Sequence, residues 1–333
     1  MIDPSALHKS LLTIDTHIDI PWPDGPAFVD DTRRCVDLPK MRRGHLVAGC
    51  FAAYVPQGPR TEAAQLAAFE RACAMLDRIT TMGGKDVVVC RSADEVEAAH
   101  RAGRHVIVPC VENGHSIGTD LARLSVFAAK GARYMTLTHN GHNALADSSN
   151  PRVDLADGAS LHGGLSEFGR AAIAEMNRLG MVIDIAHVSR DSMLQAAEIS
   201  RTPVISTHSC IKALCDHPRN LDDSQLDALR DVGGMVNITA VSGFLRKSAK
   251  PEEVTVKDYV NHLDYAVNRI GLAHVGISSD FDGGGGFAGW KNIGESAHLT
   301  AELVARGYNA PAIAALWGGN FLRVLRAAEV VSQ

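Results

Sequence analysis

The sequence predicts an α/β fold, specifically a (β/α)8 TIM-type barrel in which eight parallel strands are surrounded by helices. Two observations lead to this prediction. Eight short apolar, β-branched runs recur along the chain, separated by segments of helical periodicity that are rich in Ala, Leu and Glu. Most of these runs are followed by His, Asp or Glu, at the end of the strand where barrel enzymes build their sites.

The predicted strands number eight, which is the number that closes such a barrel. In chain order they are residues 11–17, 46–54, 105–112, 132–139, 181–187, 203–209, 234–240 and 274–280. A further run at 86–90 is strand-like but surplus to the eight. We expect it to be an excursion that precedes a helix at 92–103.

The segments between the strands predict helices at residues 61–80, 166–180, 189–200, 223–233 and 255–271. Several begin with Ser, Thr or Asp and end at Gly, as helix caps require. The Gly-rich run at 281–289 follows the last predicted strand and lacks the Lys and Ser/Thr of a phosphate-binding loop. We therefore expect a flexible loop over the site there.

The composition indicates one globular domain over residues 1–333. Of the residues, 46% are hydrophobic and 21% are charged, which allows a substantial core, and no repeat or linker divides the chain. The net charge of −5 has no concentrated basic patch, which argues against nucleic acid as a partner and favours a small-molecule substrate.

Two further features of the composition bear on where the protein works. No apolar run approaches the ~20 residues that a membrane helix needs, and the first residues lack the pattern of a secretory signal. We therefore expect no membrane partner and a cytoplasmic location. The seven cysteines are scattered and form no CxxC pair, so we expect reduced, mostly buried thiols.

The candidate site residues share one position, at or just after the carboxyl ends of six predicted strands. They are His17 and Asp19 after the first, Glu112 after the third, His139 after the fourth, His187 after the fifth, His208 after the sixth and Asp280 after the eighth. Taken singly, each of the 15 histidines is more often a surface or core residue than a ligand. Their shared placement reverses that expectation.

The ligand types predict a divalent metal centre. His17 and Asp19 are two residues apart, so on an extended strand they project from the same face and can bind one ion together. Imidazole and carboxylate without thiolate suit zinc or a similar ion, and a carboxylate such as Glu112 can bridge two ions. Such a pair lowers the pKa of a bridging water toward ~7 and polarises a carbonyl group, which favours hydrolysis.

At these residues the sequence resembles the membrane (renal) dipeptidase family of metallopeptidases. The resemblance lies in the motifs DTHID, VENGHSIG, RYMTLTHN, VIDIAHVS, PVISTHS, HPRN and DFDG, in order from about residue 14 to the GGNFLRVL near the end. It covers nearly the whole chain. It implies a (β/α)8 barrel, a homodimer and hydrolysis of dipeptides, including those with a D-residue at the carboxyl side.

The resemblance also implies a role for each motif residue. Two zinc ions would be held by His17 and Asp19 on one side, by His187 and His208 on the other, and by Glu112 between them. His139 would reach the substrate carbonyl or the oxyanion formed from it, Arg219 in HPRN would hold the terminal carboxylate, and Asp280 would handle protons. These roles are physically sensible because Arg offers a fork for a carboxylate and a carboxylate beside water can move a proton.

Some polar residues stay unassigned. Asp184 lies within a predicted strand, where two roles are open, orienting a ligand histidine or joining a buried polar network. His115, Ser116, His142 and Asn143 follow site residues and either orient ligands or pack the loops. The loops after Pro21 and Asn143 differ from those of the animal members in composition, which leaves substrate preference open because loops set barrel specificity.

Two other functions compete with a zinc dipeptidase. A related barrel hydrolase acting on another amide, lactam, lactone or N-acyl amino acid would keep the metals but lose the absolute need for Arg219. A catalytically silent barrel would bind a metal or small ligand without turnover. The intact ligand set argues against the silent barrel, because a cluster of buried like charges is costly to maintain.

Overall fold

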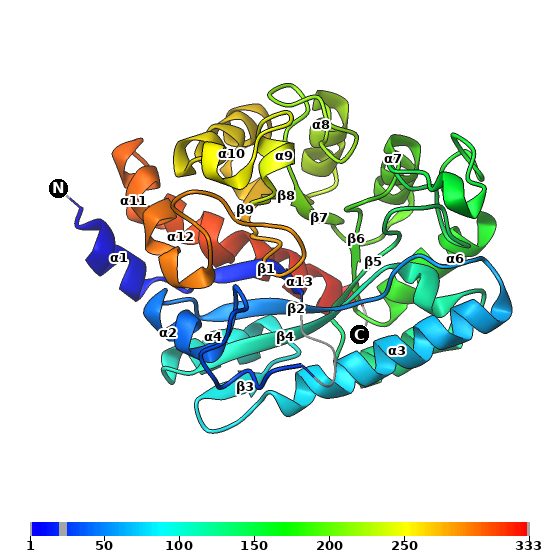
Figure 1. Cartoon of the computed structure of the whole chain (residues 1–333), viewed down its shortest axis with the longest axis horizontal. Coiled ribbons are helices and arrows are strands. Elements are labelled where there is room, and N and C mark those ends of the chain that lie inside the picture. The colour runs from blue at the N-terminus through cyan, green and yellow to red at the C-terminus, as the bar shows by residue number, and fades with distance from the viewer. Residues whose placement is uncertain (1, 20–24, 332–333) are drawn as a thin grey trace.

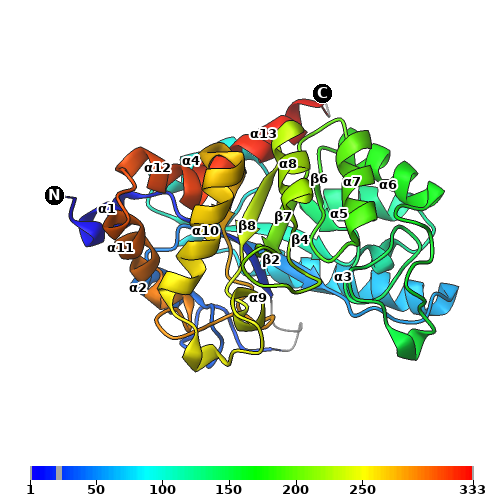
Figure 2. The same ribbon diagram turned by 90° about the horizontal axis from the view of Figure 1, so that it is seen from above.

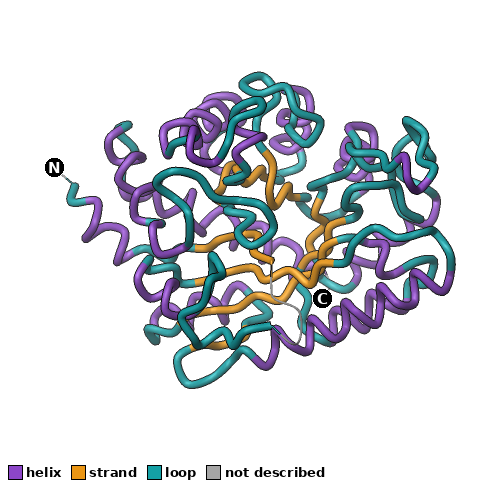
Figure 3. Tube along the Cα trace, in the orientation of Figure 1, coloured by secondary structure: helices purple, strands orange, loops and turns teal. Residues whose placement is uncertain are grey.

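The computed structural model describes residues 2–19 and 25–331, and within them one parallel sheet of nine strands is surrounded by helices (Figures 1 and 3). The strands are β1 Ile14–Asp19, β2 Ala48–Tyr54, β3 Val87–Val89, β4 His105–Glu112, β5 Tyr134–Thr136, β6 Val182–Asp184, β7 Ile205–Ser209, β8 Met235–Ile238 and β9 Val275–Ile277. All eight predicted strands are present.

The sheet follows the order β1-β2-β4-β5-β6-β7-β8-β9 and curls back on itself. Just beyond β9, Phe281 forms a parallel bridge with Ile18 of β1. The amide of Asp280 donates to the carbonyl of His17, and the amide of Asp19 donates to the carbonyl of Phe281. These bonds join the last strand to the first, so the predicted (β/α)8 barrel is confirmed.

The strand-like run at 86–90 agrees with the prediction in its position but not in its structure. It lies outside the barrel path, as predicted, but Val87–Val89 is a hydrogen-bonded ninth strand that pairs with His105–Ile107 of β4. The far end of β4 pairs instead with β5, through Val111 and Glu112. A strand of eight residues is long enough for two partners to share one edge, which the sequence pattern did not show.

The helices are α1 Pro4–Ser10, α2 Leu38–Arg43, α3 Glu62–Thr81, α4 Ala93–Arg101, α5 Ala122–Ala129, α6 Glu167–Arg178, α7 Arg190–Ile199, α8 Asp223–Asp231, α9 Ser242–Leu245, α10 Val256–Ile270, α11 Ala297–Ala305, α12 Ala310–Ala314 and α13 Asn320–Val331. The predicted caps are present, since Thr61, Ser166 and Ser189 each accept a hydrogen bond from a backbone amide of the first turn. Along the described ranges, no helix combines the length and apolar composition needed to cross a bilayer.

Helix α13 closes one end of the barrel. Phe321, Leu322 and Leu325 pack in one apolar cluster with Ile14 and Val106, which lie at the amino ends of β1 and β4. Figure 2 shows α13 on the side of the strands opposite α9. The apolar plug leaves the carboxyl end of the barrel as the open rim.

Two predictions on side features can be compared with the fold. All seven cysteines are free thiols, as expected. In the Gly-rich run, Gly283 and Gly284 border the cavity at the rim, which places that loop beside the site. The loop predicted to begin after Pro21 lies outside the described residues as far as Asp24.

Candidate metal centre and active site

The structure brings the predicted site residues together at the carboxyl rim of the barrel. His17 and Asp19 lie on β1, Glu112 ends β4, and His208 lies on β7. His139, His187 and Asp280 each follow a strand end by three residues. The polar residues leave the strand ladder where the barrel opens, so these observed strands are shorter than predicted.

Glu112 lies at the centre of this cluster. Its Oε2 atom is 3.5 Å from His17 Nε2, and its Oε1 atom is 3.2 Å from His187 Nε2 and 3.6 Å from His208 Nε2. Asp19 approaches from the side of His17, with 4.0 Å between Asp19 Oδ1 and His17 Nε2. The two oxygens of one buried carboxylate therefore face different histidines.

Two overlapping groups of side chains have ligand atoms within 4.8 Å of one another. One is His17, Glu112 and His208, and the other is Glu112, His139 and His187. Glu112 belongs to both groups, as a bridging ligand would. The grouping differs from the one implied by the resemblance, because His208 lies with His17 and His139 lies with His187.

The donor atoms fit a divalent cation. His17 Nε2 and Asp19 Oδ1 are buried and have no hydrogen-bond partner among the described residues. Unpaired polar atoms in a protein interior cost free energy, and a bound cation would satisfy both of them. Nitrogen and carboxylate oxygen donors suit zinc or a similar ion.

Negative charge dominates the electrostatics of the cluster. Burial alone would lower the pKa of His17, but Glu112, Asp280 and Asp19 outweigh it and raise that pKa to about 10. Burial raises the pKa of Asp19 well above its usual value, and the charge of Glu112 adds to the effect. Burial likewise raises the pKa of Asp280 to about 7. Carboxylates crowded in this way are stabilised by a cation.

Arg219 is a buried cation beside the cluster. It is 3% exposed, its Nη2 atom donates to the carbonyl of His208 at 3.3 Å, and its guanidinium lies 5.5 Å from the ring centroid of Phe244. Burial lowers the pKa of Arg219 to about 10, so the group stays charged at neutral pH. It forms no ion pair with a described carboxylate, and its Nε atom has no described partner.

The backbone at the rim is strained. His187, Asp280, Asp282 and Asn113 all have positive φ angles, between 58° and 84°, which L-residues rarely adopt. Gly283 is needed for close approach, since a Cβ atom there would lie 2.4 Å from Asp280 Oδ1 and 2.6 Å from an Asp19 oxygen. Strain of this kind gathers at functional sites.

The cluster opens into a cavity of about 650 Å³. Its lining residues are Asp19, Arg34, Tyr54, Arg71, Met75, Glu112, His139, Asn140, Asn150, His187, His217, Arg219, Val241, Phe244, Asp280, Asp282, Gly283 and Gly284. This volume is enough for a small molecule. His17 and His208 are buried and do not line the cavity.

Several lining residues were not predicted from the sequence. The ring of Tyr54 lies 4.8 Å from that of His139, and its place at the end of the second strand is a signal that could have identified it. Arg34 and Asp282, which both line the cavity, form an ion pair of 3.1 Å. They are far apart in the sequence, so no local pattern indicates their pairing.

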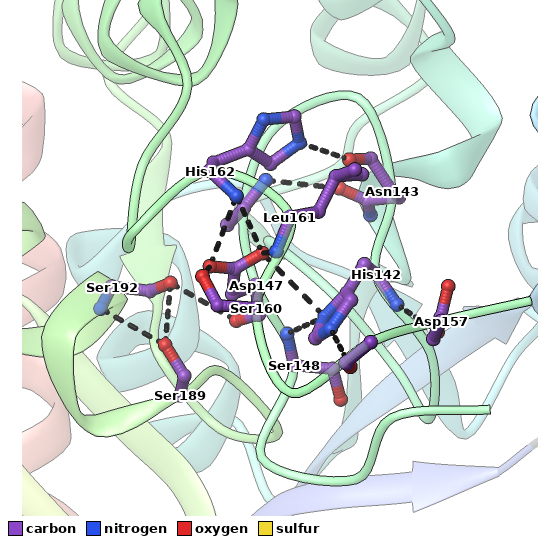
Figure 4. Close-up of polar contacts among 12 residues, drawn as sticks. His142, Asn143, Asp147, Ser148, Asp157, Ser160, Leu161, His162, Ser189 and Ser192 are labelled. Carbon is purple, nitrogen blue, oxygen red and sulfur yellow. Dashed lines mark hydrogen bonds and ion pairs between the residues drawn. The ribbon is translucent and has the colours of Figure 1, made fainter. Parts of the chain in front are cut away.

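The long segment between β5 and α6 is folded around Asp147 (Figure 4). The carboxylate of Asp147 accepts hydrogen bonds from the hydroxyl of Ser160 and from the amides of Leu161, His162 and Gly164. Asp147 is 1% exposed. These bonds lower the pKa of Asp147 against the raising effect of burial.

This segment also fastens two site histidines by their backbones. The hydroxyl of Ser148 donates to the carbonyl of His139 at 2.6 Å, and the amide of Ser149 donates to that of His187 at 2.8 Å. His142 accepts from the amide of Ser148. His142 therefore packs the loop, one of the two roles left open for it.

The loops are also packed by three further residues that the sequence left unassigned, Asn143, His115 and Ser116. Asn143 donates to the carbonyl of Leu137 and accepts from the amide of Leu145, which closes a turn. His115 lies 3.1 Å from Gln57 through its Nδ1 atom. None of the three lines the cavity.

Comparison with known proteins gives one family. Residues 3–333 match the family model described as membrane dipeptidase (Peptidase family M19). Dipeptidase verJ of Clonostachys rogersoniana is 33% identical over 96% of this chain and 84% of its own length.

Solved structures agree. The probable dipeptidase PvdM of Pseudomonas aeruginosa has a TM-score of 0.92 at 29% identity, covering 98% of both chains. A metallopeptidase of Rhodobacter sphaeroides, liganded with a phosphinate mimic of the dipeptide L-Ala-D-Ala, has a TM-score of 0.83 at 27% identity, covering 96% of this chain and 99% of its own. The whole barrel, and not one segment of it, is shared.

Proposed function

The chain belongs to the membrane dipeptidase family, Peptidase family M19, and from this premise we propose that it hydrolyses dipeptides with two zinc ions at the rim of the barrel. A hydrolase of the dipeptidase class with a metal cofactor follows from the family. The observation that supports two ions is the position of Glu112, whose two oxygens face different histidines.

The proposed ligands are His17 and Asp19 for one ion, His187 and His208 for the other, and Glu112 for both. This pairing is supported by Glu112, whose Oε1 atom is approached by both His187 and His208 and whose Oε2 atom is approached by His17. When bound, such a pair supplies a hydroxide nucleophile at neutral pH and polarises the carbonyl group under attack. The buried unpaired atoms of His17 and Asp19 support the first half of this assignment.

The residues of the chain then position the dipeptide. Arg219 would bind its terminal carboxylate, because its buried guanidinium has unused N–H donors and no described carboxylate partner. His139 would donate an N–H to the substrate carbonyl oxygen as negative charge develops there. Burial lowers the pKa of His139, which keeps its imidazole neutral and able to donate without adding a second charge.

Asp280 would hold and move the proton. Its carboxyl group is buried and lines the cavity beside Asp19 and Glu112, and a carboxylate beside the attacking water can take up and release a proton. It would accept a proton from the attacking water and deliver it to the nitrogen of the leaving amine. Its closeness to Asp19 through Gly283 supports this position beside the metals.

We propose that the substrates include dipeptides with a D-residue at the carboxyl side. The support is the Rhodobacter sphaeroides relative, which was solved with a mimic of L-Ala-D-Ala. The test is elemental analysis of metal together with release of amino acids from L,L and L,D dipeptides. About two zinc ions with turnover would support the proposal; two ions without turnover would favour another amide, lactam, lactone or N-acyl amino acid, and no metal would refute the mechanism.

We also propose that residues 1–333 fold as one domain, that the protein is a homodimer and that it works in the cytoplasm. These proposals rest on the sequence and its resemblance to the family. Light scattering after size exclusion would measure the mass against the 35.5 kDa of one chain. A single cooperative unfolding transition would support one domain.

A further inference from the structure

The proposed ligand His208 forms a hydrogen bond with a threonine hydroxyl through its Nδ1 atom. Its Nδ1 atom lies 2.9 Å from Thr207 Oγ1, and that oxygen lies 2.7 Å from Asp184 Oδ2. A hydroxyl has one proton, and an ionised carboxylate can only accept. The proton of Thr207 therefore goes to Asp184, so the nitrogen of His208 must be the donor to Thr207.

His17 also forms a hydrogen bond with a hydroxyl group through its Nδ1 atom. Its Nδ1 atom lies 2.8 Å from the hydroxyl of Tyr134, and that hydroxyl donates to the carbonyl of Thr16 at 3.0 Å. A carbonyl can only accept, so the one proton of Tyr134 is again used. His17 must then donate from Nδ1, which leaves Nε2, 3.5 Å from Glu112 Oε2, as the nitrogen that a metal ion would bind.

The third ligand histidine lacks this support. His187 Nδ1 is buried and has no hydrogen-bond partner among the described residues. The hydrogen bond to a hydroxyl is therefore specific to two positions and is not a general consequence of burying a histidine in this barrel.

The carboxylate of Asp184 is held by four hydrogen bonds. Its Oδ1 atom accepts from the amides of Ala186 and Thr207, and its Oδ2 atom accepts from the hydroxyls of Thr207 and Thr136. It is fully buried between β5, β6 and β7. Four donors fix the carboxylate in place, and Thr207 transmits that position to His208.

We propose that Thr207 with Asp184, and Tyr134 with the carbonyl of Thr16, are positioning residues that fix the Nδ1–H tautomer of His208 and His17. Because each hydroxyl accepts the Nδ1 proton of its histidine, the Nε2 atom, which lies near Glu112, is the one available to bind a metal. This inference rests on the proposed metal ligands. It assigns to Asp184 the first of the two roles that the sequence left open.

The test compares three threonine variants for their affinity for Zn²⁺, measured by competition with a chromophoric chelator. Thr207→Val removes the hydroxyl with little change of shape and should weaken one of two zinc sites about 10- to 100-fold, the usual effect of losing such a partner. Thr207→Ser keeps the hydroxyl and should restore the affinity. Thr300→Val is the matched control, because it removes a buried threonine hydroxyl that lies 2.7 Å from Nδ1 of His8, a histidine outside the metal site, and should bind zinc normally.

A second measurement is made on the unaltered, metal-free protein. Its ¹⁵N spectrum should show the proton of His208 on Nδ1, and the variant His208→Gln serves only to assign the His208 signals. A proton on Nε2, or equal loss of zinc affinity in Thr207→Val and Thr300→Val, would overturn the inference. Failure of the proposed function would instead be seen as missing turnover or missing zinc in the unaltered protein, which leaves the tautomer reading intact.

Discussion

Replacing Arg219 should separate substrate anchoring from chemistry. Arg219→Met keeps an aliphatic side chain of similar length and removes the charged fork, whose central carbon lies 5.5 Å from the ring centroid of Phe244. A hydrogen bond to a charged group contributes about 1.5–3 kcal/mol. At about 1.4 kcal/mol for each factor of ten, the expected rise in KM for a free dipeptide is about 10- to 100-fold.

The assay pairs each dipeptide with its carboxyl-amidated analogue and measures kcat and KM for both. The amide carries no charge for Arg219 to bind, so its KM should change little between the two enzymes. Arg219→Lys should fall between, because an ammonium keeps the charge but not the fork. Arg60→Met is the control, since Arg60 pairs with Asp157 and does not line the cavity. Equal losses on the free and amidated substrates would refute an anchoring role.

Three further outcomes are expected. Glu112→Gln should lower bound metal below that of the unaltered protein and abolish hydrolysis; normal metal content with activity would remove Glu112 from the site. Gly283→Ala should lower kcat about 10- to 100-fold by displacing Asp280, with Gly243→Ala, whose added Cβ meets nothing within 4 Å, unaffected. Asp147→Asn should lose about 1–3 kcal/mol of unfolding free energy at pH 7, measured by urea titration. The folded pKa of Asp147 is lowered, so its contribution is present above its unfolded pKa of about 4 and lost as the pH falls through the folded value; an Asn variant as stable as the parent at pH 7 would contradict this.

The strands and the rim residues could be predicted from the sequence because both depend on local patterns. A buried parallel strand is an apolar run of a few residues, and the chain marks its end with a polar group. His17 and Asp19 follow this rule at β1, as Glu112 does at β4. The residue types at the rim then favour hydrolysis with a divalent metal.

The rest of the site depends on contacts between distant segments. The Arg34–Asp282 pair that lines the cavity and the hydrogen bond between Tyr134 and His17 each join residues that are far apart in the chain. Either member alone has an ordinary surface or core interpretation. The pairing of β3 with β4 was not predicted for a similar reason. Only the structure shows that β4 is long enough for β3 and β5 to pair with different parts of it.

The rim also explains how a strained and highly charged cluster can exist before any metal arrives. His187 and Asp280 have positive φ angles, yet their backbones are tied by hydrogen bonds from Ser149 and to His17 respectively. These bonds lie in the barrel closure and in the segment folded around Asp147, which are stabilised elsewhere in the fold. Because these backbones are fixed in advance, a metal bound by the proposed ligands need not reorganise them, and its binding free energy is available to offset the repulsion among the buried carboxylates.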